Sequence, residues 1–209
     1  MHVKVGYIER LTEESTLSRG KMKTKLSESE SQQELGWLLT DSIYDLCAPV
    51  EVFRNYLKVY ESADSNTDNS QHMFDAVVRL CRHSVVMAIC KLEDALVHHG
   101  RAYKDAPEEI MRRVKSFRKH FEDKKYRTLR SKFIAHNFDS YETHTYQDGE
   151  RIASGIYGST ISDLKSYFDW IKPPEDCLEL REESPAWIAC DLKKHIQSRI
   201  DLIPRVPLH

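Results

Sequence analysis

The clearest helical pattern in the sequence is FDAVVRLCRHSVVMAICKLEDAL, residues 74–96. Its apolar residues recur at steps of three and four, which is the spacing of a helix that buries one stripe of its surface. They are Phe74, Val77, Val78, Cys81, Val85, Ala88, Ile89, Leu92 and Leu96. Residues 62–70 are polar and predict a loop before this helix, and Gly100 is expected to end it.

Two neighbouring segments show the same spacing. Residues 35–60 predict a helix on the amino-terminal side, which Pro49 is expected to kink or split. A third helix is expected from Asp105, as a capping residue, to Phe133, with a break near Asp123-Lys124. The sequence therefore predicts three amphipathic segments in succession.

The remaining segments complete the expected fold. Asp148-Gly149 lies between two stretches with strand-like spacing, which predicts a β-hairpin near residues 141–157. Helices are expected to begin near Thr160 and at Ser184-Pro185, because both places carry capping signals. The expected fold class is all-α: an up-and-down bundle of about five helices with a small β-hairpin insertion.

Length and composition favour one globular domain. The chain has 209 residues, of which 40% are hydrophobic and 31% charged, with 7 Gly and 7 Pro. These values argue against collagen-like, wholly disordered and all-β chains. Residues 1–34 are too polar to pack into a core and predict a mobile amino-terminal arm, so the helical domain is expected over residues 35–209.

No part of the sequence predicts a membrane or secreted protein. The longest aliphatic and sulfur run, Val85 to Cys90, is far shorter than the roughly 20 residues of a spanning helix. Residues 1–10 are charged where a secretory signal would be apolar. The five cysteines form an odd set without Cys-x-x-Cys, which is typical of reduced thiols in a cytoplasmic protein.

Several kinds of catalytic site have no support in the sequence. It lacks the phosphate-binding Gly-x-x-x-x-Gly-Lys-Ser/Thr and Gly-x-Gly-x-x-Gly loops, and also His-Glu-x-x-His and Gly-x-Ser-x-Gly. His98 and His99 are adjacent, so their rings point to different helix faces. This arrangement favours contacts of the two histidines with helix-end carbonyls over a shared metal site. No metal or cofactor is expected.

Positive charge is concentrated in one region. Residues 101–133 contain 12 Lys and Arg against 5 Asp and Glu, a net charge of +7, which leaves −9 for the rest of the chain. Clustered Lys and Arg attract nucleic acid through counterion release. The alternative is a solvated helix face whose long side chains cover apolar neighbours.

The basic region ends in YRTLRSKFIAHNFD, residues 126–139. Arg130 is followed by Lys132, by His136 after an alanine, and by Asp139. This pattern resembles the HEPN superfamily, whose mark is Arg, four to six residues and then His. The layout of the chain as a whole is most similar to the abortive-infection AbiU-type branch of that superfamily.

The resemblance implies a metal-independent endoribonuclease that acts in phage defence or as a toxin. Arg130 would hold the scissile phosphate and His136 would act as general base or acid, leaving a 2′,3′-cyclic phosphate. The implied site consists of Arg130 and His136 as catalytic residues and of Lys132, Arg127, Asn137 and Asp139 as substrate-binding residues. The implied partners are RNA, a second copy of the chain in a homodimer, and an antitoxin or other regulatory protein.

The helix geometry and a second match to the spacing keep interpretations other than a ribonuclease site open. On a regular helix Arg130 and His136 would lie about 120° apart and about 9 Å along the axis, so they would not converge. In a purely structural alternative, Arg130 pairs with an acid such as Asp94, and His136 bonds a helix-end carbonyl. Arg113 and His120 also match the bare spacing.

The predicted hairpin adds a further alternative. Its tyrosines, Tyr141, Tyr146 and Tyr157, either stack on unpaired bases or cover an edge of the core.

The rival to the ribonuclease is a non-catalytic dimeric helical module that binds a nucleotide, RNA or a partner protein. A third possibility is a structural bundle that buries the Arg130 and His136 side chains.

Overall fold

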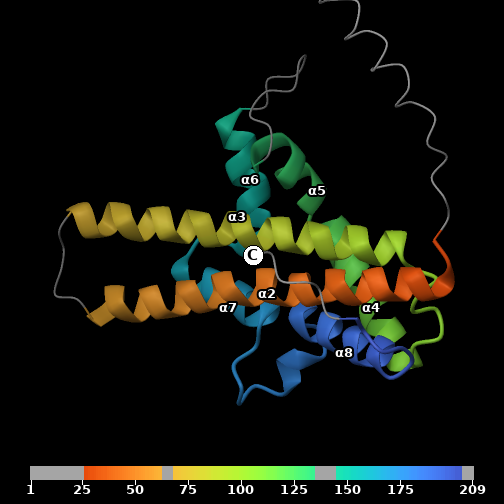
Figure 1. Ribbon diagram of the computed structural model, residues 1–209. Coiled ribbons are helices and arrows are strands. Elements are labelled where there is room, and N and C mark those ends of the chain that lie inside the picture. Colours follow the sequence, from red (N-terminus) through yellow and green to blue (C-terminus); the bar gives the residue numbers. More distant parts are fainter. Residues whose placement is uncertain (1–25, 63–67, 135–144, 204–209) are drawn as a thin grey trace, which may run out of the picture.

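The computed structural model describes residues 26–62, 68–134 and 145–203, and this part of the chain is helical, without a β-strand. Two long helices, α2 (Glu28–Ser62) and α3 (Asp68–His98), lie side by side through the centre (Figure 1). The predicted all-α bundle is confirmed. Among the described helices, none is both long and apolar enough to cross a membrane.

Helix α2 begins earlier than the spacing of its leucines indicates. It starts at Glu28, so residues 28–34 of the predicted arm are helical, while residues 1–25 lie outside the described part. The Ser27 amide donates to Glu30 Oε2 (2.8 Å), and the Glu30 amide donates to Ser27 Oγ (3.2 Å). This reciprocal cap satisfies two amides that would otherwise lack partners. Helix α2 continues through Pro49.

The core is centred on the interface between α2 and α3. Its fully buried side chains include Leu35, Leu39, Leu46, Val50, Val85, Ile89 and Leu92. Burying one such side chain stabilises a fold by roughly 1.5–3 kcal/mol. The apolar stripes of the two helices therefore supply much of the driving force for folding.

The predicted third helix is divided as the break near Asp123-Lys124 indicated. Helix α4 (Glu108–Asp123) ends before Lys125, which has a left-handed φ of 58°. Then follow α5 (Tyr126–Leu129) and a π-helical turn, η1 (Arg130–Ile134). The predicted cap was wrong: Pro107 is the N-cap, because Asp105 pairs instead with Arg199 of the carboxyl-terminal region.

The second half of the predicted hairpin is wrong. Residues Tyr146–Tyr157 form helix α6, and Asp148 closes a capping box with Thr145 rather than a hairpin turn. Ala153, Ile156 and Tyr157 lie buried, the last two at steps of three and four residues from the first, which is helical spacing. The aspartate that indicated a turn also suits the first turn of a helix, which explains the error. Tyr141 and the Tyr146 side chain lie outside the described part.

Three further elements cover the core. Helix α7 (Ile161–Ile171) and α8 (Pro185–Gln197) begin after Thr160 and Ser184, as predicted, with the 3-10 turn η2 (Glu179–Arg181) between them. Both α7 and α8 pack against α2, while α5 and η1 pack against α3 (Figure 1). The segment with the basic motif thus lies on α3, away from α8.

Candidate functional site

Helix α5 and the π-helical turn η1 carry the described part of the basic motif. Tyr126 and Leu129 are buried and anchor α5, which leaves Arg127 and Arg130 to project from another face. These two arginines are three residues apart, a spacing that makes side chains neighbours on a helix. The backbone then changes to i→i+5 bonding, a rare geometry that is frequent at functional sites.

Asp94 of α3 binds both arginines. Arg130 Nη1 donates to Asp94 Oδ2 (2.9 Å), and Arg127 Nη2 donates to Asp94 Oδ1 (3.1 Å). Each carboxylate oxygen therefore holds one guanidinium, and the two guanidiniums lie next to each other. The Arg130–Asp94 pair expected in the structural alternative is present.

Glu93 anchors the same cluster from inside the protein. Its side chain is only 4% exposed, and it pairs with Arg127 and, at 3.6 Å, with Nε of Arg118 on α4. The hydrogen bond to Glu93 raises the pKa of Arg127. A buried carboxylate is tolerated when cations compensate it, so Glu93 fixes α4 and α5 against α3.

The cluster retains unused capacity for an anion. It contains three arginines and two carboxylates, a net charge of +1 before Lys132 is counted. The Arg127 and Arg130 side chains are 55% and 29% exposed. Within the described residues, Nη2 of Arg130 and Nη1 of Arg127 make no hydrogen bond. A guanidinium presents five donors, so each arginine can bind a phosphate while Asp94 holds it.

The carboxyl-terminal half of the predicted site lies beyond the described residues. These residues are His136, Asn137 and Asp139, because the structure describes the chain up to Ile134 and again from Thr145. Lys132 is half-buried in η1. The 120° separation expected of Arg130 and His136 assumes a regular α-helix. Residues Arg130–Ile134 are π-helical instead, so this value does not apply.

The second match to the spacing, Arg113 with His120, is part of the core. Arg113 is buried; it donates to Asp191 Oδ2 (2.7 Å) and to the Glu182 carbonyl (2.6 Å). The His120 ring lies 4.4 Å from the Trp170 ring, and burial lowers its pKa. These contacts identify Arg113 as a structural cation that joins α4 to α8.

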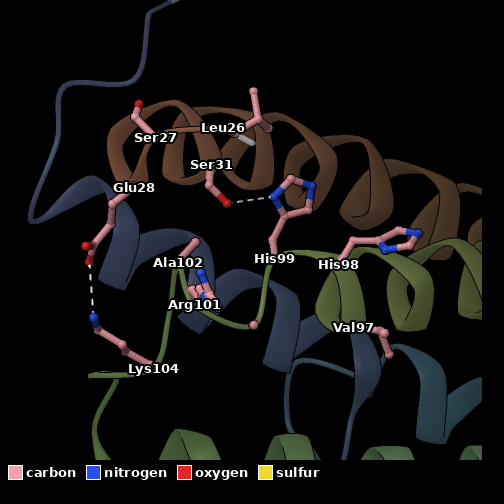
Figure 2. A pocket seen from close by; sticks show the side chains of 11 residues that line it. Leu26, Ser27, Glu28, Ser31, Val97, His98, His99, Arg101, Ala102 and Lys104 are labelled. Carbon is pink, nitrogen blue, oxygen red and sulfur yellow. Dashed lines mark hydrogen bonds and ion pairs between the residues drawn. The ribbon is translucent and has the colours of Figure 1, made fainter. Parts of the chain in front are cut away.

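The two adjacent histidines line a surface hollow at the end of α3. Figure 2 shows His99 turned toward Ser31, whose Oγ lies 3.0 Å from His99 Nδ1, in place of the predicted contact with carbonyls. This pocket, of about 760 Å³, shares both histidines with a second pocket of about 600 Å³ that extends to Asp94. The described residues contain no group of three or more side chains suited to a metal ion.

Sequence reasoning did not identify Glu93 and Arg118 as parts of this site. The available signal was the position of Glu93 on the buried stripe of residues 74–96, because a fully buried glutamate is rarely found without a partner. Arg118 could not be singled out among the many cations of α4.

Comparison with known proteins finds one with a similar fold but assigns the chain to no family. No protein-family model matches the chain, and no curated protein matches it. A solved structure of an integron cassette protein from the mobile metagenome of V. paracholerae is similar, with a TM-score of 0.62 and 19% sequence identity. The similarity covers 83% of this chain and 99% of the other. At this identity it supports the helical architecture alone.

Proposed function

We propose that the chain is a metal-independent endoribonuclease of the HEPN type, with Arg130 and His136 as its catalytic residues. The observation that carries the proposal is the pair of guanidiniums, Arg127 and Arg130, that Asp94 holds side by side at the surface. Two adjacent, partly exposed arginines suit a phosphodiester, whose oxygens accept paired hydrogen bonds. The π-helical turn Arg130–Ile134 follows, and His136 comes two residues after it in the sequence.

The proposed reaction is an internal phosphoryl transfer. The ribose 2′-oxygen attacks the adjacent phosphorus and its proton passes to His136, while the bond from phosphorus to the 5′-oxygen breaks. The leaving oxygen takes up a proton, so the products are a 2′,3′-cyclic phosphate and a 5′-hydroxyl. Imidazole suits this role because it exchanges protons near neutral pH.

The other residues of the site have supporting roles in this proposal. Arg130 neutralises the charge that develops on the phosphoryl oxygens, which a guanidinium matches with paired donors. Arg127 and Lys132 bind the flanking phosphates, and Asn137 or Asp139 orients the His136 ring. Asp94 is a positioning residue, since it reaches the substrate only through the arginines.

A second candidate function is RNA or nucleotide binding without cleavage. The direct Arg130–Asp94 hydrogen bond favours it, because this pair gives Arg130 a structural role that requires no histidine. Such a module uses the same basic surface and differs only in the absence of proton transfer.

The proposal extends to assembly and compartment. Two copies of the chain form a homodimer with their motifs facing each other, and an antitoxin or similar protein controls the activity in phage defence. The protein acts in the cytoplasm, in keeping with its free cysteines. Burial raises the pKa of Cys90 to about 11, so this thiol is protonated and unreactive at neutral pH.

The test is cleavage of total RNA by the purified protein in EDTA. The parent is compared with His136→Ala and with His120→Ala, the matched control from the other Arg and His pair, at equal folding and oligomeric state. We expect cleavage by the parent and by His120→Ala, and none by His136→Ala. Equal cleavage by His136→Ala contradicts the catalytic assignment. RNA binding without cleavage by the parent favours the binding module.

A further inference from the structure

Basic side chains continue along α3 beyond the candidate site. Arg79, Arg82 and His83 precede Cys90 and Asp94, and steps of three and four residues connect Arg79 and His83 to Asp94 on one face of the helix. With a rise of 1.5 Å per residue, Arg79 lies about 22 Å from Asp94 along the axis. Two arginines of α3, Arg79 and Arg82, therefore lie at one end of this length of the helix face, and Arg127 and Arg130 bind at its Asp94 end.

Helix α6 holds Arg82 and His83 of this basic stripe, the face of α3 from Arg79 to Asp94, in place. The Arg82 guanidinium carbon lies 4.6 Å from the centre of the Tyr157 ring, a cation–π contact that fixes its direction. Arg82 Nε is buried and has no hydrogen-bond partner among the described residues. His83 is half-buried and faces Glu150 of α6, together with Arg79 and Arg82 of its own helix.

The end of the stripe is open to a ligand. Arg79 is exposed and makes no ion pair with any residue in the described ranges. Unlike Arg127 and Arg130, which share Asp94, it keeps its full positive charge. An exposed arginine without a carboxylate partner gains most from meeting a phosphate.

The stripe and the candidate site lie on the same side of α3. Both α5 and η1 contact α3, and α5 also contacts α6 (Figure 1). A Cβ atom placed on Gly149 of α6 would lie 2.6 Å from the Phe133 ring of η1, so these two elements touch. Helix α6 contacts both Arg82 of α3 and Phe133 of η1, so it lies between the candidate site and Arg79, and a strand that binds at both places passes along α6.

We propose that Arg79 and Arg82 form a further phosphate-binding subsite for the RNA strand that is held at Arg127 and Arg130. This inference rests on the proposed function and adds that the protein requires a substrate longer than the scissile dinucleotide. Single-stranded RNA fits the stripe because its charges are evenly spaced and its backbone is adaptable. An acidic protein is the less suitable ligand, because its carboxylates would have to match the spacing of these arginines.

Binding of non-cleavable RNA tests the subsite. The probes are 2′-O-methyl oligouridylates of 4 and 12 nucleotides, and their Kd is measured by fluorescence anisotropy between 50 and 250 mM salt. We expect Arg79→Gln to weaken binding of the 12-mer about five- to tenfold and to reduce its salt slope by about 0.7, the value for one phosphate on a single strand. Binding of the 4-mer is expected to stay unchanged.

Two further variants make the result unambiguous. Lys58→Gln removes one charge from an exposed position on α2 and is expected to leave both oligonucleotides unaffected. Arg130→Gln is expected to weaken binding of the 4-mer and the 12-mer alike. If Arg130→Gln has this effect while Arg79→Gln behaves like Lys58→Gln, the subsite is wrong and the proposed function stands. If the parent binds neither oligonucleotide, both proposals are overturned.

Discussion

Asp94 of α3 accepts a hydrogen bond of 2.9 Å from Arg130, the first residue of the π-helical turn. The same carboxylate accepts a second bond from Arg127. One aspartate therefore joins the central helix to the motif segment and sets the distance between two cations. In the proposed mechanism it also competes with the substrate, because its charge partly neutralises the arginines that bind phosphate.

Removing this competing charge is expected to strengthen RNA binding. Asp94→Asn keeps the size of the side chain and eliminates one negative charge next to the phosphate site. For solvent-exposed unit charges about 4 Å apart, with the dielectric constant of water, such a change alters the binding free energy by about 1 kcal/mol, or Kd by about fivefold. Anisotropy with 2′-O-methyl RNA measures it, and Asp45→Asn, on α2, is the control. Weaker binding by Asp94→Asn would contradict competition and indicate a purely positioning role.

Gly149 is expected to tolerate no side chain, unlike a second glycine of α6. Gly149→Ala places a Cβ atom 2.6 Å from the Phe133 ring, whereas Gly155→Ala meets nothing within 4 Å. We expect Gly149→Ala to lower the free energy of unfolding by roughly 1–3 kcal/mol, the usual cost of overpacking. Gly155→Ala is expected to raise it by up to about 1 kcal/mol through helix propensity. Urea unfolding compares the two, and equal effects would contradict the contact.

Ser184 is expected to contribute more to stability than a serine on the surface. Its Oγ accepts from the Trp187 amide at the start of α8 and donates to the Ile171 carbonyl (2.7 Å) in the core. We expect Ser184→Ala to lower the free energy of unfolding by about 1–2 kcal/mol. Ser166→Ala, at an exposed position in α7, is expected to change it by less than about 0.5 kcal/mol. Thermal unfolding gives both values, and a loss no larger than that of Ser166→Ala would show that the cap is dispensable.

Stability is expected to fall as the pH is lowered from 7.5 to 5.5. Burial lowers the pKa values of His83, His99 and His120 below their usual 6.5. The unfolded chain therefore binds protons in this range that the folded chain does not, so stability is full above pH 6.5 and is lost below it. His120→Gln is expected to remove up to about 1.4 kcal/mol of this loss per pH unit. A pH dependence identical to that of the parent would contradict the burial argument for His120.

The long helices and the caps of α7 and α8 could be predicted from sequence because the signals are local. The buried stripe of α3, the break before Lys125 and the caps at Thr160 and Ser184 all follow from spacing and residue type. The hairpin was the main error in the fold. Asp148 and Gly149 suit both a turn and a first helical turn, and the capping box of Thr145 with Asp148 favours the helix.

The candidate site was predictable only in part. The motif identified Arg127, Arg130 and Lys132, and Asp94 was foreseen as a partner of Arg130. The roles of Glu93 and Arg118 depend on how α4 packs against α3, which is a relationship between distant segments. The π-helical turn was not foreseen either, because no residue type marks i→i+5 bonding.

The most direct test of the central claim is cleavage of a defined RNA in EDTA, with one scissile ribose replaced by its 2′-deoxy counterpart. The mechanism requires the 2′-hydroxyl as nucleophile. We therefore predict cleavage of the all-ribose strand, with a 2′,3′-cyclic phosphate and a 5′-hydroxyl at the ends, and no cleavage at the 2′-deoxy position. Cleavage at the 2′-deoxy position, or products that end in a 3′-hydroxyl, would contradict Arg130 and His136 chemistry.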